Sequence, residues 1–173
     1  MRDVEAEGPV TAVFHAGGVG PQAAIAATDI ADLADAVAGK AAGARHLDEL
    51  FGDRALDAFV LFSSGAGVWG GGQQGAYAAA NAFLDALAEE RRARGLAATS
   101  VAWGAWAGGG MLAENAEADA RLRRMGFSPM APPLAVAALA RALEHDETSV
   151  AVADRLGALR PVVRVGAPAS PHR

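Results

Sequence analysis

A serine, a tyrosine and an asparagine lie within one stretch of the chain, residues 59–94, at spacings that could bring their side chains together. Tyr77 and Asn81 are four residues apart in an alanine-rich segment that predicts a helix, so they share one helix face. Ser64 stands thirteen residues before Tyr77, after a short apolar run, 58–62, that predicts a strand covered on both faces. Two hydroxyl groups that face one crevice suit acid–base chemistry.

A tyrosine needs help to act as an acid or base at neutral pH, because a phenol has a pKa of about 10. A fixed cation that stabilises the phenolate would supply that help. Lys40 is one candidate, and it is the only lysine in the chain. It lies in the middle of a predicted helix, 29–50, for which Thr28 or Asp29 is the expected N-cap. Being the only lysine does not by itself identify its role.

The elements that must position these residues alternate along the chain. Strand patterns alternate with helix patterns, and this order predicts a parallel sheet with ligands bound at the carboxyl ends of its strands. The predicted strands are residues 9–15, 58–62, 97–103 and 149–153, and the predicted helices are 29–50, 77–92, 114–125 and 134–144. The last segment, 157–173, contains three prolines and few core residues, so we expect a loose tail.

Composition and charge exclude several classes of function. The chain has 173 residues, a net charge of −5 and no cysteine, which argues against nucleic acid, an anionic membrane, a disulfide or a thiolate metal site. No apolar run is long enough to span a bilayer, and we expect a cytoplasmic protein. The four histidines are scattered, so no metal site is expected. Asp48 and Glu49 are expected to be carboxylates on a helix surface.

Four segments of the sequence resemble the ketoreductase domain of modular polyketide synthases, within the short-chain dehydrogenase/reductase superfamily. They are HAGGV at 15–19, GKAAGARHLDEL at 39–50, the block at 62–88 that contains YAAAN, and SVAWGAW at 100–106. The resemblance implies an α/β fold with a partial Rossmann-like parallel sheet flanked by helices, the second half of a short-chain dehydrogenase/reductase fold. Residues 1–156 would form the C-terminal half of the catalytic domain, with a lid at about 108–126.

The resemblance also implies roles for individual residues. Tyr77 would be the proton donor, Ser64 would hold the substrate carbonyl, and Lys40 and Asn81 would complete the catalytic group, with the Lys40 charge stabilising the tyrosine phenolate. Ser63 is expected to be structural. The implied cofactor-binding residues are His15, Ala16, Gly17, Gly18, Lys40, Tyr77, Trp103 and Gly104.

The implied reaction is the NADPH-dependent reduction of a β-ketoacyl thioester to a β-hydroxyacyl thioester in polyketide biosynthesis. The substrate would be carried on the phosphopantetheine arm of an acyl carrier protein, beside other polyketide synthase domains. The residues implied to control stereochemistry are Trp69, Gln74 and Met111. Trp69, together with Gly20-Pro21-Gln22 where the opposite group has Leu-Asp-Asp, matches the A-type pattern, and Gln74 favours a substrate whose α-substituent is not epimerised.

One part of the superfamily pattern is missing. The expected glycine-rich turn that holds the cofactor pyrophosphate should follow the first strand of the fold. Here Gly65-Ala66-Gly67 and Gly70-Gly71-Gly72 follow the catalytic strand, which is the wrong place. The alternative hypothesis is therefore a catalytically incomplete fragment that acts only when paired with another polypeptide, and whose strand at 9–15 presents an open edge. A reductase of free small ketones is disfavoured, because Asn81 stands where such enzymes carry lysine.

Overall fold

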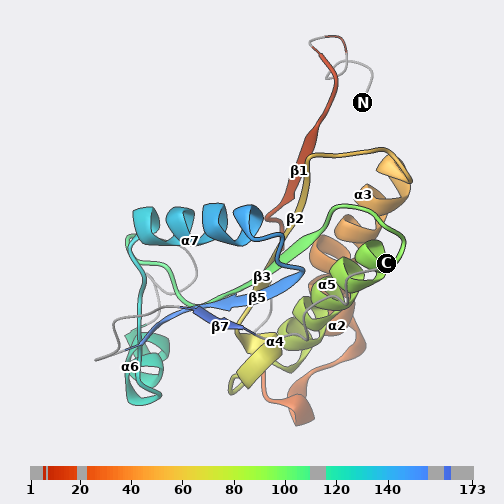
Figure 1. Cartoon of the computed structure of the whole chain (residues 1–173). Coiled ribbons are helices and arrows are strands. Elements are labelled where there is room, and N and C mark those ends of the chain that lie inside the picture. Colours follow the sequence, from red (N-terminus) through yellow and green to blue (C-terminus); the bar gives the residue numbers. More distant parts are fainter. Residues whose placement is uncertain (1–5, 7, 19–22, 110–115, 156–161, 165–173) are drawn as a thin grey trace.

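Strands from distant parts of the sequence form one sheet (Figure 1). The computed structural model describes residues 6, 8–18, 23–109, 116–155 and 162–164. Within these residues the sheet has the order β1-β2-β3-β5-β7. Its strands are β1 (Ala12–His15), β2 (Ala58–Ser64), β3 (Thr99–Trp103), β5 (Ser149–Val152) and β7 (Val162–Arg164). The first four pair in parallel, which confirms the predicted α/β fold with a parallel sheet.

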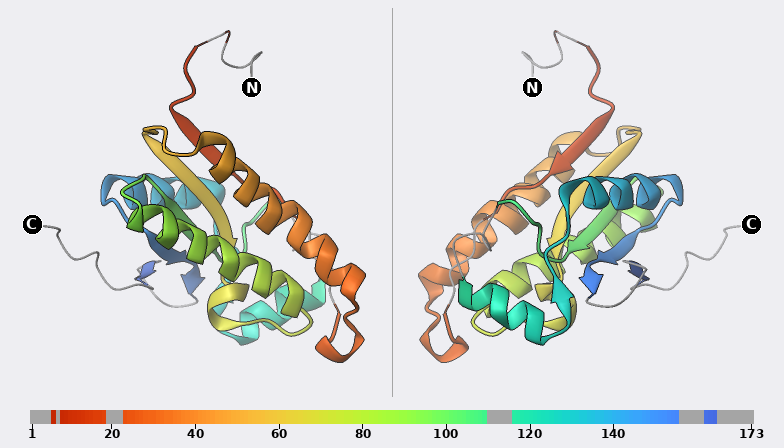
Figure 2. Two further views of the ribbon diagram at one scale, coloured as in Figure 1. Left: turned by 90° about the vertical axis from the view of Figure 1, so that its right-hand side faces the viewer. Right: turned by 90° about the vertical axis from the view of Figure 1, so that its left-hand side faces the viewer.

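Helices cover both faces of the sheet (Figure 2). On one face lie α2 (Ile30–Val37), the π-helical turn η2 (Ala38–Ala42), α3 (Gly43–Phe51) and α5 (Gly75–Ala93). The other face is covered by α7 (Pro132–Glu144). The shorter elements are η1 (Ile25–Ala27), α4 (Ala66–Trp69), α6 (Ala116–Arg124), β4 (Phe127–Ser128) and β6 (Asp154–Arg155). None of the described helices has the length and hydropathy needed to cross a membrane.

The alternation of side chains along β2 divides the core into two clusters. Phe59 and Leu61 pack in the cluster that contains Leu84 and Leu87 of α5. Phe62 packs with the opposite cluster, whose buried members come from β3, β5 and α7 and include Met130 from the segment before α7. Because successive residues of a strand point to opposite faces, the odd-numbered residues of β2 face α5. This register also directs Ser63 towards α5.

The predicted helix at 29–50 is observed, with one change of geometry in its middle. Asp29 is its N-cap, and Asp29 and Asp32 form a reciprocal capping box. The α-helical hydrogen bonding changes to a π-helical turn at Ala38–Ala42, which contains Lys40. Such turns recur at functional sites because they rotate a side chain out of the regular helical register.

The expectation of a loose C-terminal tail is wrong at one place. Val162–Arg164 forms β7, which pairs antiparallel with β5 through Val152↔Val162, so Ser149–Val152 is not the final strand. The physical reason is that β5 would otherwise leave a row of unpaired backbone groups at that edge. The rest of the segment 157–173 lies outside the described residues.

The opposite edge of the sheet is β1. In the part of the chain that the structure describes, β1 pairs with β2 alone, as the open-edge prediction requires. Its burial alternates, so that Val13 and His15 are buried while Phe14 remains 53% exposed. A large apolar side chain on an unpaired edge strand is a site at which another chain can add.

The prediction that Asp48 is a surface carboxylate is wrong. Its carboxylate is buried and forms ion pairs with Arg91 and, at 2.6 Å, with Arg94. The Arg91 guanidinium carbon lies 3.9 Å from the centre of the Phe59 ring, so the cation is also covered by an aromatic face. Glu49, the next residue, is exposed as predicted and pairs with Arg45 at 3.3 Å.

Replacing Asp48 with asparagine should strongly destabilise the protein. Burial acts to raise the pKa of this carboxyl, but the hydrogen bonds and charges of Arg94 and Arg91 outweigh it and lower the pKa. The carboxylate therefore stabilises the fold above its unfolded-state pKa, and this contribution is lost as the pH falls through the folded-state pKa. At pH 7 we expect Asp48→Asn to lower the free energy of unfolding by about 3 to 5 kcal/mol, because Arg91 stays buried without its partner.

Denaturant unfolding at pH 7 and in acid measures both effects. The matched control is Glu49→Gln, which removes an exposed carboxylate from the same helix and should cost less than about 1 kcal/mol. Equal, small effects of the two substitutions would contradict the assignment of Asp48 to a buried ion pair.

Candidate active site

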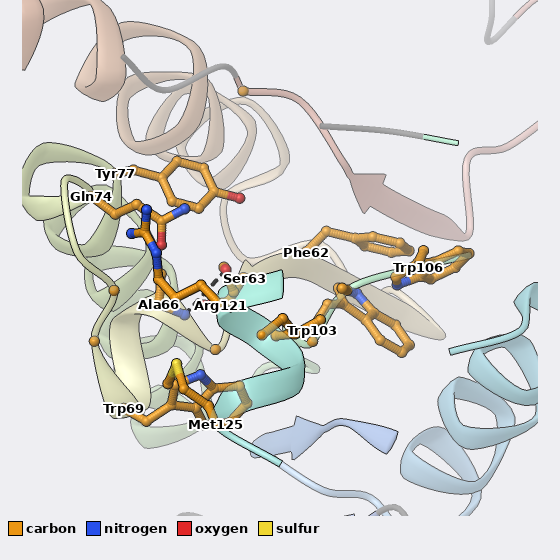
Figure 3. A pocket seen from close by; sticks show the side chains of 18 of the residues that line it. Phe62, Ser63, Ala66, Trp69, Gln74, Tyr77, Trp103, Trp106, Arg121 and Met125 are labelled. Carbon is orange, nitrogen blue, oxygen red and sulfur yellow. Dashed lines mark hydrogen bonds between the residues drawn. The ribbon is translucent and has the colours of Figure 1, made fainter. Parts of the chain in front are cut away.

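A cavity of about 350 Å³ opens at the carboxyl ends of β2 and β3. Lys40, Ser64 and Tyr77, three of the four residues predicted to be catalytic, line it together. In Figure 3 the Tyr77 hydroxyl points into the space between the two walls described below. The structure thus brings a phenol, a hydroxymethyl group and an ammonium from three elements to one place.

Lys40 reaches the site from the π-helical turn. Its side chain is buried, and its Nζ donates a hydrogen bond of 2.8 Å to the carbonyl oxygen of Phe62, near the end of β2. The same nitrogen lies 5.6 Å from the centre of the Tyr77 ring. Burial lowers the pKa of Lys40 to about 8, and the negative charge of Asp85 acts in the opposite direction. The ammonium is therefore held beside the phenol while retaining its charge at neutral pH.

The end of β1 fixes the backbone of this turn. The Nε2 of His15 donates a hydrogen bond of 2.9 Å to the carbonyl oxygen of Lys40. Gly18 has φ +132°, and a Cβ at that position would lie 2.5 Å from Cγ of Lys40. Only glycine therefore allows the lysine side chain to pass over this segment. Two of the residues predicted to bind cofactor, His15 and Gly17, are not among the described cavity-lining residues. His15 instead binds the Lys40 backbone.

Ser64 and Asn81 differ in their relation to the cavity. The Oγ of Ser64 accepts a hydrogen bond of 3.2 Å from the Ala66 amide, so its hydroxyl hydrogen can still be donated to a ligand. Asn81 is fully buried and lies behind the cavity wall, where its Nδ2 donates to the Tyr77 carbonyl oxygen at 2.7 Å. Its Oδ1 has no partner among the described residues. Asn81 thus holds the helix turn that carries Tyr77 and does not line the cavity.

One wall of the cavity carries two of the residues predicted to control stereochemistry. Trp69 and Gln74 both line it, whereas Met111 lies outside the described residues. The Trp69 ring stacks on Phe127 with centroids 5.1 Å apart, and it covers Gly65 so closely that a Cβ there would collide with the ring. Figure 3 shows Trp69 beside Met125, on the opposite side of the cavity from Tyr77.

Several lining residues were not predicted from the sequence. Phe62, Trp103 and Trp106 form a second aromatic wall, with Trp103 and Trp106 edge-to-face at 5.1 Å (Figure 3). Trp103 was predicted only as a cofactor contact. Residues of α6 and the turn after it, which lie in the predicted lid region, complete the lining with Arg121, Leu122 and Met125. Arg121 also donates a hydrogen bond of 3.0 Å to the Gly72 carbonyl oxygen. The only sequence signal for this segment is its helical pattern, which predicts the helix but not its partner.

The cavity fits one end of a nicotinamide dinucleotide. Ala16, Gly18, Trp103 and Gly104, four of the residues expected to bind cofactor, line it, and the small residues among them allow a planar ring to approach Lys40 and Tyr77 closely. Residues 65–70 have the spacing G-x-G-x-x-G after β2, but α4 is only one turn long and the Trp69 ring covers Gly65. This turn is therefore unlike a pyrophosphate-binding helix start. The described residues contain no cluster of three metal-binding side chains.

The protonation of Lys40 can be measured directly. Because the chain has a single lysine, labelling lysine with ¹³C gives one side-chain signal, whose shift follows the charge of Nζ. In the folded chain we expect a titration midpoint of about 8 instead of the usual 10.5, because burial disfavours the ammonium. The same sample unfolded in urea is the control and should titrate at the usual value. A folded-state midpoint equal to the unfolded one would contradict the buried ammonium.

The sequence is similar to a known protein family and to its curated members. A family model described as "KR domain" matches residues 1–108. The chain is 55% identical, over 151 residues, to the pikromycin polyketide synthase component PikAIII of Streptomyces venezuelae, a match that covers 87% of this chain and 10% of that protein. The chain therefore spans about a tenth of the length of this relative.

Solved structures of polyketide synthase ketoreductases are also similar to this chain. A structure described as that of A-type ketoreductases from a modular polyketide synthase superposes with a TM-score of 0.82 at 47% identity, covering 90% of this chain and 34% of that one. A C2-type ketoreductase superposes with a TM-score of 0.78 at 48% identity, covering 86% and 32%. This chain superposes on about a third of each of these ketoreductases, and the likeness to both types does not select between them. The chain belongs to the KR domain family, within the short-chain dehydrogenase/reductase superfamily.

Proposed function

We propose that this chain is the C-terminal part of a ketoreductase domain that reduces a β-ketoacyl thioester to a β-hydroxyacyl thioester in polyketide biosynthesis. The observation that carries the proposal is the convergence of Lys40, Ser64 and Tyr77 on one cavity at the carboxyl ends of parallel strands. Such an edge is where open α/β sheets bind their ligands. The relatives in the polyketide synthases support the reaction class.

In this mechanism Ser64 donates its hydroxyl hydrogen to the ketone oxygen and fixes the carbonyl beside Tyr77. The Tyr77 phenol then gives its proton to that oxygen, which becomes the new hydroxyl group. The Lys40 ammonium, 5.6 Å from the centre of the tyrosine ring, stabilises the phenolate that remains. When bound, the cofactor supplies the hydride that reaches the carbonyl carbon. Asn81 keeps the helix turn below Tyr77 in place through its bond to the Tyr77 carbonyl oxygen.

We propose NADPH as the cofactor, with its nicotinamide end between Gly18, Lys40 and Tyr77. The substrate would arrive on the phosphopantetheine arm of an acyl carrier protein, within an assembly of other polyketide synthase domains. The two aromatic walls of the cavity suit an acyl chain that enters between them. Trp69, on the opposite side of the cavity from Tyr77, and Gln74, which also lines the cavity, support an A-type reduction of a substrate whose α-substituent is not epimerised.

A second candidate function concerns this chain by itself. We propose that residues 1–156, with a lid at about 108–126, are a catalytic half that acts only with a second polypeptide or segment carrying the pyrophosphate-binding turn. Two observations favour it. In the described structure β1 is an edge strand with an exposed Phe14, and the G-x-G-x-x-G stretch directly after β2, residues 65–70, is covered by Trp69.

Tyr77→Phe should nearly abolish ketone reduction in the complete domain, formed by this chain and its cofactor-binding half. Without the phenol no proton reaches the alkoxide, so kcat should fall by about 10² to 10⁴-fold. Nicotinamide binding should stay unchanged, because the ring remains in place. The matched control is Phe83→Leu, which replaces an aromatic residue on the exposed face of the same helix and should retain turnover. Full turnover by the Tyr77→Phe protein would reject the assignment.

Titrating the purified chain with NADPH tests the second candidate. We expect no tight binding by the chain alone, since its pyrophosphate would have no helix start to bind, and recovery of binding when a glycine-rich partner half is added. Nicotinamide fluorescence reports both results. Tight binding by the chain alone would contradict the dependence on a partner.

A further inference from the structure

Lys40 is bound at both ends by two neighbouring strands. Its Nζ donates a hydrogen bond of 2.8 Å to the carbonyl oxygen of Phe62 in β2. Its own backbone carbonyl oxygen accepts a hydrogen bond of 2.9 Å from Nε2 of His15, the last residue of β1. β1 and β2 pair in parallel, with His15 opposite Leu61, the residue before Phe62. The lysine is therefore fixed to one region of the sheet through both its backbone and its ammonium.

The bond from His15 supports an unusual helical turn. In η2 the Gly43 amide is shared between the carbonyl oxygens of Ala38 and Lys40, and its bond to Ala38 closes the wider ring of a π-helix. A carbonyl oxygen has two lone pairs, so the Lys40 oxygen can accept from Gly43 and from His15 together. His15 thus adds a donor from outside the helix at the residue whose side chain must reach the site.

The His15 ring fits closely between two glycines. A Cβ at Gly43 would lie 3.1 Å from Cε1 of His15, and a Cβ at Gly17 would lie 3.3 Å from the same atom. Both distances are shorter than an ordinary van der Waals contact. Because the ring is also buried, its orientation towards the Lys40 carbonyl oxygen is set by packing as well as by the hydrogen bond.

The hydrogen bond identifies the tautomer of the ring. A carbonyl oxygen can only accept, so Nε2 of His15 must carry a proton. Burial lowers the pKa of His15, the bond to the Lys40 carbonyl oxygen acts to raise it, and the Lys40 charge lowers it again. The ring is therefore neutral at neutral pH, with its one proton on Nε2 and none on Nδ1.

We propose that His15 is a positioning residue of this active site, whose Nε2–H holds the π-helical turn in the geometry that directs the Lys40 ammonium to the end of β2. This role differs from the cofactor contact that the resemblance implies, and His15 is not among the described residues that line the cavity. The inference rests on the proposed role of Lys40 in the reduction, because His15 acts on the chemistry only through that lysine.

The test follows the single lysine signal of the full chain through a pH titration in two variants. His15→Met fills the space with a side chain that has no donor, and His15→Gln restores an N–H near the position of Nε2. Without the donor the turn can return to regular α-helical bonding and move Lys40 towards water. In His15→Met the midpoint should therefore rise from about 8 towards the usual 10.5, whereas in His15→Gln it should stay near 8.

Two outcomes of this titration would overturn the proposal. A native midpoint in His15→Met would mean that the turn keeps its geometry without the donor. An equal rise in both variants would mean that the shape of the ring, and not its N–H, holds the turn.

A second measurement needs no substitution and applies even if the His15→Met chain does not fold. In the native chain labelled with ¹⁵N at histidine, the His15 ring should give the nitrogen shifts of the neutral tautomer protonated on Nε2. A proton on Nδ1 alone would overturn the proposal, since Nε2 would then have nothing to donate. Neither experiment includes a reduction step, so failure here would leave the assignment of Tyr77 intact, and failure of the Tyr77→Phe test would leave the positioning of Lys40 intact.

Discussion

A buried ammonium is the constraint on which the rest of the site depends. Removing a cation from water is costly, and the cost falls only if polar groups surround the charge. Here the Phe62 carbonyl oxygen accepts a hydrogen bond from Lys40, and the Asp85 carboxylate supplies opposite charge. The π-helical turn carries Lys40, the His15 ring binds its backbone carbonyl oxygen, and the absence of a side chain at Gly18 leaves room for the lysine side chain. Together these three features let this one cation reach the end of β2.

The same strand serves both the core and the site. Along β2, Phe59 and Leu61 fill the space under α5, and two residues later Ser63 faces the same helix with a hydroxyl group in place of a hydrocarbon. The transition from apolar to polar occurs where the strand leaves the sheet. Packing therefore holds the strand rigidly up to the point at which its side chains become available for chemistry, and this rigidity positions Ser64.

The sequence predicted the features that depend on local pattern. The alternation of strands and helices, the Asp29 cap and the convergence of Lys40, Ser64 and Tyr77 follow from periodicity, capping chemistry and family spacing. The features it missed depend on partners far along the chain. Asp48 is buried only because Arg91 and Arg94 reach it from α5 and the residue that follows it.

Other features could not be predicted from the sequence because they too depend on partners far along the chain. The segment at Val162–Arg164 has no strand pattern longer than three residues, and its pairing is decided by the open side of β5. The inward position of Asn81 depends on which face of α5 meets the sheet, and a shared face with Tyr77 does not determine how deep each side chain lies. The aromatic wall of Trp103 and Trp106 forms only where the segment after β3 folds back beside Met130.

All three tryptophans of the chain, Trp69, Trp103 and Trp106, line the same cavity. The ultraviolet emission of the protein therefore originates in the walls of its binding site, with no indole elsewhere to add a background. Trp69 faces the side formed by α6, and Trp103 and Trp106 stand at the strand ends, so the two walls sense different parts of the space. Tryptophan fluorescence should therefore report directly on the binding of a ligand in this cavity, without an added dye or tag.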